Sequence, residues 1–179
     1  MKTRITVSFL ILASLICYLQ EQKAKPRELI CETQKTKNEP ELQDIITNTC
    51  SLGDLKFVSI GSPDYKGRYS WESKVYKWTG KTYVQKKYSE IFINTALLEK
   101  KINDENKKAY ESDIKRPEIS ECMGFIKYRK FSLDEMEINF DELGNPQFTL
   151  TYNSIPLVCF NVNATIIPMK LSEFNSYIK

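Results

Sequence analysis

The sequence contains no histidine among its 179 residues. Histidine is the commonest general acid or base near neutral pH and a common zinc ligand, so its absence removes the usual means of activating a nucleophile or holding a catalytic metal. We therefore expect no catalytic residue, no cofactor and no bound metal, and we interpret the chain as a protein that is not an enzyme.

The sequence also lacks the marks of a nucleic-acid-binding protein, since it has no arginine-rich stripe and no aromatic block of the RNA-recognition type. The formal net charge of +3 falls to +1 once Lys2 and Arg4, which lie in the first twenty residues, are set aside. This balance predicts no nucleic-acid partner. No internal repeat is present, which predicts one folded domain.

The first twenty residues have the pattern of a signal peptide. Lys2 and Arg4 precede an apolar run over residues 5–19, and the chain turns polar at Gln20. The run is short for a membrane span but typical of a secretory signal, so we expect the remaining chain to be periplasmic or secreted.

The fate of this N-terminus stays open. No A-x-A cleavage pattern is present, Cys17 could be lipidated, and the segment could remain as an uncleaved anchor. Contact with a membrane is expected only through such an anchor.

Four cysteines follow the signal peptide, and an even number in an oxidising compartment predicts two disulfides. Four cysteines allow three pairings. Cys31 and Cys50 flank a short helical candidate, whereas Cys122 and Cys159 fall on strand-like runs, so we expect the pairs 31–50 and 122–159. A zinc site built from all four thiolates is disfavoured because the sequence has no C-x-x-C pair.

Residues 21–40 are polar and predict a flexible tether, which leaves residues 41–179 as a single α+β domain. Apolar spacing predicts a short N-terminal helix that ends near Cys50, a middle helix over residues 95–114, and a C-terminal helix with Leu171, Phe174, Tyr177 and Ile178 on one side.

Alternating apolar and polar residues predict strands over residues 55–60, 90–94, 122–131, 135–140, 147–152 and 157–167. Residues 68–88 predict a β-hairpin, with a bulge near Val75 where the aromatic positions shift from odd to even. This order of elements predicts an α+β fold with a mostly antiparallel sheet.

Two groups of residues invite a functional interpretation. The first is the acidic run Asp134, Glu135, Glu137, Asp141 and Glu142, which could hold calcium or contact a cationic partner. The run lacks EF-hand spacing and alternates as a solvated strand face does. Glu135 and Glu137 would point the same way about 7 Å apart on one strand, an arrangement that only weakly suggests a carboxylate hydrolase.

The second group is aromatic and comprises Tyr69, Trp71, Tyr76, Trp78 and Tyr83. We expect these rings to form core on one face, and any ring that points outward is a candidate anchor for a partner. The loop over residues 61–67 is the best candidate partner-binding segment, with Asp64 and Tyr65 as its anchors.

The hairpin sequence over residues 67–71 and 75–84, GRYSW followed by VYKWTGKTYV, resembles a hairpin of small bacterial periplasmic proteins similar to lysozyme inhibitors and toxin-immunity proteins. Residues 149–179 are similar to the closing segment of uncharacterised envelope families. The resemblance implies a non-enzymatic inhibitor or immunity protein whose partner is a secreted toxin or cell-wall hydrolase. An envelope structural or adhesion protein is the alternative, and a carboxylate-dependent hydrolase is a distant one.

Overall fold

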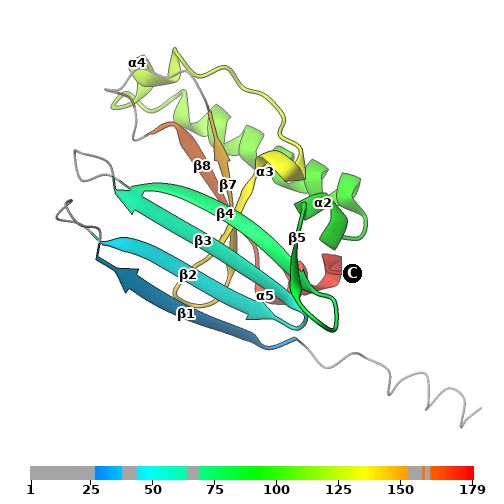
Figure 1. Cartoon of the computed structure of the whole chain (residues 1–179). Coiled ribbons are helices and arrows are strands. Elements are labelled where there is room, and N and C mark those ends of the chain that lie inside the picture. Colours follow the sequence, from blue (N-terminus) through cyan, green and yellow to red (C-terminus); the bar gives the residue numbers. More distant parts are fainter. Residues whose placement is uncertain (1–26, 38–43, 64–68, 153–158, 160–161) are drawn as a thin grey trace, which may run out of the picture.

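The computed structural model describes residues 27–37, 44–63, 69–152, 159 and 162–179. They form an α+β fold with two antiparallel sheets, which confirms the predicted fold class (Figure 1). The larger sheet has the order β1-β2-β3-β4-β5, and its strands are β1 (Leu29–Thr36), β2 (Ile45–Leu52), β3 (Leu55–Pro63), β4 (Tyr69–Trp78) and β5 (Tyr83–Lys86). The smaller sheet has the order β6-β7-β8, and its strands are β6 (Glu137–Phe140), β7 (Pro146–Thr151) and β8 (Ala164–Pro168).

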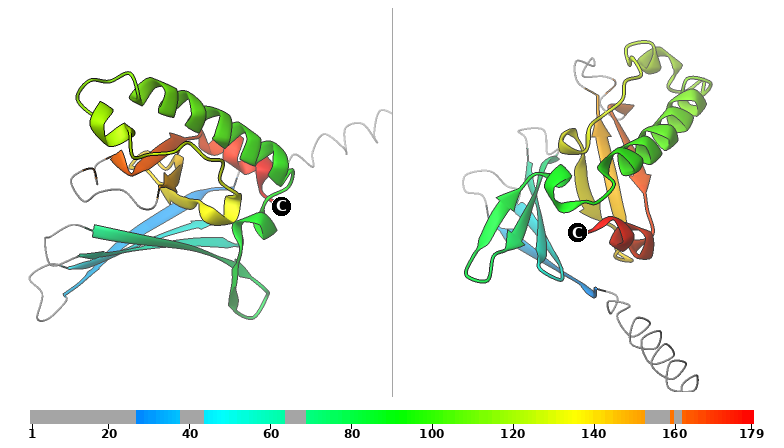
Figure 2. Two further views of the ribbon diagram at one scale, coloured as in Figure 1. Left: turned by 90° about the horizontal axis from the view of Figure 1, so that it is seen from above. Right: turned by 90° about the vertical axis from the view of Figure 1, so that its right-hand side faces the viewer.

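The helices lie between the sheets in sequence and at the end of the described chain. They are α2 (Tyr88–Ile91), α3 (Thr95–Asp113), α4 (Ser120–Met123), the 3-10 helix η1 (Leu133–Glu135) and α5 (Leu171–Tyr177). Figure 2 shows three layers, with the five-stranded sheet on one side, the smaller sheet in the middle and α3 on the other side. Within the described residues, no helix is long and apolar enough to cross a membrane.

The core joins the two sheets and the C-terminal helix α5 at one aromatic side chain. Phe174 of α5 is fully buried, and its ring centroid lies 5.4–6.0 Å from those of Phe57, Phe92, Phe140 and Phe148. Phe57 comes from the larger sheet, while Phe140 and Phe148 come from the smaller one. Burial of Phe174 therefore holds the two sheets together, and the C-terminal helix predicted from its apolar spacing is confirmed.

The N-terminal part of the domain differs from the prediction. Residues 29–36 form strand β1 within the predicted tether, and residues 45–52 form strand β2 where a helix was expected. The two strands pair in antiparallel register, and their main-chain hydrogen bonds need no apolar pattern in β1. The β-branched residues Ile45, Ile46, Thr47 and Thr49 favour a strand over the expected helix.

The segment over residues 122–131 was also expected to be a strand, and this expectation is wrong. Ser120–Met123 form helix α4, and the following residues up to Phe131 run without regular structure. Asn103 of α3 explains why the segment that ends at Phe131 is not a strand. Its side chain accepts a hydrogen bond from the Phe131 amide and donates one to the Phe131 carbonyl, both at 2.8 Å. A buried side chain thus takes the place of a neighbouring strand.

Two further local expectations are corrected by the structure. Residues 88–91 form helix α2, and Phe92 makes an isolated bridge with Ile178 in place of the strand expected over residues 90–94. No bulge occurs near Val75, because β3 and β4 pair without interruption from Leu55 with Lys77 to Pro63 with Tyr69. The shift in aromatic positions instead places rings on both faces of β4.

Two disulfides join Cys31 to Cys50 and Cys122 to Cys159, the pairing that the sequence analysis expects. Their surroundings differ from the expectation, because Cys31 and Cys50 lie opposite each other on β1 and β2 and Cys122 lies in α4. Two disulfides are compatible with an exported protein.

Candidate functional site

A cavity of about 310 Å³ lies between the two sheets. We call it the inter-sheet groove. Its described lining residues come from six strands, three from each sheet: Asn48, Cys50, Phe57, Ser59, Trp71, Glu137, Ile138, Asn139, Phe140, Gln147, Thr149 and Ile166.

The larger sheet contributes the face that also carries Phe57 and Val75, here called its inner face. One end of this face is apolar and packs into the core through Leu52, Leu55, Phe57 and Val75. Two residues further along each strand, the side chains at the same face become polar: Asn48, Ser59 and Ser73. The inner face is therefore dry at one end and hydrophilic where the groove opens.

The smaller sheet contributes the face opposite its core face. Ile138, Phe148 and Leu150 point into the core, so Glu137, Asn139, Gln147 and Thr149 point to the other side. Register places Glu137 beside Thr149 and Asn139 beside Gln147. The alternation predicted for residues 135–140 is confirmed for the strand β6, and its polar face lines the groove.

A short hydrogen-bond chain crosses from one sheet to the other. The Ser73 hydroxyl donates to Asn139 Oδ1 at 2.9 Å and lies 3.3 Å from Ser59 Oγ. Between β1 and β2 of the larger sheet, the Thr33 hydroxyl donates to Asn48 Oδ1 at 2.8 Å. Both amide oxygens are thus occupied, and the amide nitrogens of Asn48 and Asn139 have no hydrogen-bond partner among the residues that the structure describes.

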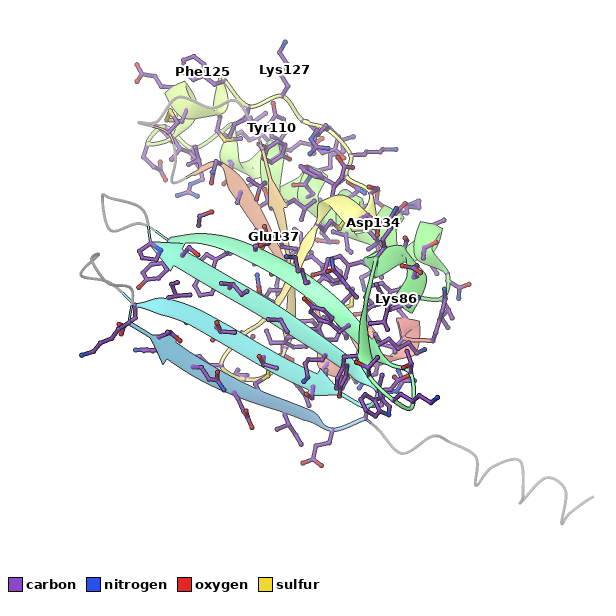
Figure 3. All side chains as sticks on the ribbon, viewed as in Figure 1. Lys86, Tyr110, Phe125, Lys127, Asp134 and Glu137 are labelled. Atoms are coloured by element: carbon purple, nitrogen blue, oxygen red, sulfur yellow. A yellow bond between two sulfur atoms is a disulfide. The ribbon has the colours of Figure 1, made fainter. Side chains whose placement is uncertain are left out.

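Glu137 is the only ionisable residue among the described residues that line the groove. Figure 3 shows it between β4 and the smaller sheet, in the middle of the molecule. Burial raises the pKa of Glu137, and the nearby Glu72 carboxylate raises the pKa further. No basic side chain forms an ion pair with Glu137 in the part of the chain that the structure covers.

We expect Glu137→Gln to raise the melting temperature at neutral pH, because it removes a charge that burial disfavours. The pKa of Glu137 is higher in the folded state than in the unfolded state, so the folded protein binds more protons between the two values and its stability falls as pH rises through this window. This gain in melting temperature should vanish when the pH falls below the ordinary pKa of glutamate. Thermal unfolding followed between about pH 3 and pH 7 measures this.

Glu135 provides the matched control with the opposite sign. The Ser132 amide donates to Glu135 at 2.9 Å and Arg129 at 2.8 Å, and these contacts, with the Ser132 hydroxyl, lower the pKa of Glu135 to about 2. Glu135→Gln should lower the melting temperature at neutral pH, and the loss should fade as pH falls toward 2. Shifts of the same sign in both variants would contradict this assignment.

Trp71 forms the aromatic wall of the groove. It lies opposite Gly61 in the β3–β4 register, and a Cβ atom at position 61 would lie 2.8 Å from the Trp71 ring. Glycine at this position therefore makes room for the indole to lie against β3. The ring remains 37% exposed and contacts Tyr69, whose hydroxyl donates to the Asp44 carbonyl.

The remaining aromatic residues lie on the outer face of the larger sheet. Trp78 and Tyr83 are paired across β4 and β5 with ring centroids 5.1 Å apart, and the Lys56 ammonium lies 4.2 Å above the Tyr83 ring. We call Lys56, Trp78 and Tyr83 the hairpin patch. None of the five aromatic residues is fully buried, so the expectation that they form core is wrong, whereas rings of the hairpin patch do point outward.

The acidic residues lie apart from one another. Asp134 accepts hydrogen bonds from the Ser89 amide and hydroxyl, and Asp141 accepts from the Leu143 and Asn145 amides in the turn before β7. Glu135 belongs to η1 and Glu137 to β6, so the expectation that these two carboxylates share a strand face is wrong. No group of three or more potential metal ligands occurs within the described ranges.

The candidate anchors Asp64 and Tyr65 lie outside the described residues. No known protein family, curated protein or solved structure matches the chain.

Sequence reasoning missed most of the groove. Asn48 lay in a predicted helix, and Ser59, Gln147 and Thr149 are ordinary polar residues of alternating strands. The alternation in each strand signals a polar face, but it does not tell which faces meet. Only the packing of β4 and β3 beside β6 brings them together.

Proposed function

We propose that the protein is an exported binding protein without enzymatic activity, an inhibitor or immunity protein that occludes a secreted toxin or cell-wall hydrolase. The observation that carries this proposal is the hairpin patch. Trp78 is 44% exposed and Tyr83 is 37% exposed, and large aromatic side chains that remain exposed on a rigid support are the usual anchors of protein interfaces.

The support of the patch is well defined. The Trp78 amide donates to the Asp54 carbonyl at 2.8 Å, and the Thr79 amide and hydroxyl both donate to the Thr82 carbonyl across the turn. Contacts of Tyr83 with Trp78 and Lys56 fix its ring before any partner arrives. A surface that is ordered in advance loses little conformational entropy on binding.

The location of the protein belongs to the same proposal. We propose that it acts in the periplasm or outside the cell. The two disulfides support this, because such bonds persist in oxidising compartments.

The test is titration of the exported protein against purified secreted muramidases, amidases and peptidoglycan endopeptidases, with peptidoglycan hydrolysis as the readout. We expect one of these enzymes to be inhibited stoichiometrically and saturably. Trp78→Ala combined with Tyr83→Ala should weaken that inhibition at least about thirtyfold, since loss of a hot-spot residue costs 2 kcal/mol or more.

Phe125→Ala is the matched control. Phe125 is 59% exposed and lies beyond α4, away from the hairpin patch in Figure 3, so its removal should leave inhibition unchanged. Equal inhibition by the wild type and the hairpin double variant would reject the patch and turn attention to Asp64 and Tyr65, which remain predicted anchors. Inhibition of no enzyme would favour an envelope structural or adhesion protein, and turnover of a glycan that is lost in Glu137→Gln would favour a hydrolase.

A further inference from the structure

We propose that the inter-sheet groove is a binding site for a short neutral saccharide. The groove and the hairpin patch lie on opposite faces of the larger sheet, so this proposal does not depend on the proposed inhibition. It rests on the charge, the hydrogen-bonding groups and the apolar surface of the groove.

The charge of the lining excludes anionic ligands. Among the described residues that line the groove, Glu137 is the only ionisable one, and none is a lysine or an arginine. A phosphate or carboxylate group would lie beside the Glu137 carboxylate without a cation to balance it, and the nearby Glu72 adds to the repulsion. The ligand is therefore neutral or positively charged.

The hydrogen-bonding groups of the groove distinguish a neutral ligand from a positively charged one. In the side-chain amides of Asn48 and Asn139, the oxygen already accepts a hydrogen bond from Thr33 or Ser73. The amide nitrogen has no partner among the described residues and can donate to a ligand. An ammonium group can only donate, so it would pair with Glu137 and leave both amide donors unmet. A sugar hydroxyl donates and accepts at once, so adjacent hydroxyls can accept from the amides and donate to Glu137.

The apolar part of the groove fits the C–H face of a sugar ring. Trp71 lies flat against Gly61 with 37% of its surface exposed, and Phe57 and Ile166 also line the groove. The C–H groups of a pyranose ring can pack on an indole while its hydroxyls face polar side chains. The volume of about 310 Å³ lies at the lower end of the roughly 300–1,000 Å³ of small-molecule sites, which limits the ligand to one or two sugar units.

An extended peptide fits this groove less well. Peptides that bind between strands usually add themselves to a free sheet edge. Of the strands that line the groove, β2, β3, β4 and β7 are each paired on both sides within their sheets. The edge strand β6 lies beside β4, where Ser73 donates to Asn139, and the edge strand β8 contributes Ile166 alone among the described lining residues. Recognition in the groove therefore relies on side chains, as in a small-molecule site.

The experiment titrates the full-length exported protein with cellobiose, maltose and the disaccharide of N-acetylglucosamine, using calorimetry and saturation-transfer NMR. Glucuronate and cadaverine serve as the anionic and cationic probes. We expect saturable binding of at least one neutral disaccharide, with no binding of glucuronate and weaker binding of cadaverine. Saturation transfer should be strongest at the ring C–H protons that face Trp71.

Three groove variants should weaken this binding. Trp71→Ala should abolish it, Glu137→Gln should weaken it about ten- to a hundredfold, and Thr149→Val about two- to tenfold, as expected for charged and neutral hydrogen bonds. Thr49→Val makes the same change on the outer face of β2 and should leave the affinity unchanged. Circular dichroism and thermal melting verify that each variant is folded.

Three results would overturn the proposal. One is the absence of saturable binding for every neutral disaccharide by a folded wild-type protein. Another is tighter binding of cadaverine or glucuronate than of any sugar, which would assign the groove to a charged ligand. Binding that Thr149→Val and Thr49→Val reduce equally would place the sugar outside the groove and would overturn it as well.

Discussion

Phe174→Ala is expected to lower the free energy of unfolding by about 3–5 kcal/mol, the cost of removing a large buried aromatic side chain. Phe174 is fully buried, and four other phenylalanine rings surround it. Its partners belong to both sheets and to the segment after α2. The cavity that Phe174→Ala leaves therefore cannot be filled by a shift of one element. Urea unfolding with intact disulfides measures the loss.

Two further variants make this result specific. Phe174→Leu keeps most of the volume and should cost about 1.5 kcal/mol or less, whereas Phe125→Ala removes an exposed ring and should cost under about 0.5 kcal/mol. A cost for Phe174→Ala similar to that of Phe125→Ala would contradict the central place of Phe174 in the core.

Asn103→Ala is expected to cost about 2–4 kcal/mol, because it leaves two buried backbone groups of Phe131 without partners. Asn103 is 5% exposed, and its side chain also donates to the Glu99 carbonyl within α3. The amide proton of Phe131 should exchange with solvent much faster in this variant. Urea unfolding and amide hydrogen exchange provide the two measurements.

Asn106 is the matched control on the same helix. It is also buried, but it only accepts one hydrogen bond, from the Tyr152 hydroxyl at 3.1 Å, and its amide nitrogen has no partner among the described residues. Asn106→Ala should therefore cost about 1–2 kcal/mol, less than Asn103→Ala, because it removes one hydrogen bond and also an amide nitrogen without a described partner. If Asn106→Ala were as costly as Asn103→Ala, the bridge to Phe131 would not be what stabilises this segment.

The parts of the fold that the sequence predicts well have strong local patterns. The helix α3 has Leu98 and Ile102 buried on one side, and β7 alternates apolar and polar residues over its length. The β4–β5 hairpin has β-branched and aromatic residues on either side of a glycine-containing turn. The patterns of α3 and β7 reflect faces that are buried against the rest of the protein, whereas the hairpin is recognised from its turn and its strand-forming residues.

The failures lie where distant groups decide the local structure. Strand β1 is exposed at seven of its eight residues, so burial leaves no pattern in its sequence. Residues 124–132 contain Phe125, Ile126 and Phe131, which suggested a strand. Instead, the Asn103 side chain of α3 binds both backbone groups of Phe131, and the amide of the following Leu133 donates to Glu99 of α3. Neither contact can be inferred from neighbouring residues.

The candidate site could be predicted only in its parts. The polar face of Glu137 and Asn139 follows from alternation, and Trp71 and Trp78 stand out by their size. That Trp71 meets Glu137 in one groove while Trp78 lies on the opposite face depends on how two sheets pack. The packing is set by Phe57, Phe140 and Phe174, which are far apart in sequence.

Strand β1 also shows how little burial determines the alignment of the outermost strand. A slip by two residues would place Thr33 opposite Cys50, keep every side chain on its present face and move only Leu29 away from the core. The bond between Cys31 and Cys50 permits one of these alignments and forbids the other. Oxidation of two thiols, and not the burial of apolar surface, therefore decides the register of β1 at the edge of the larger sheet.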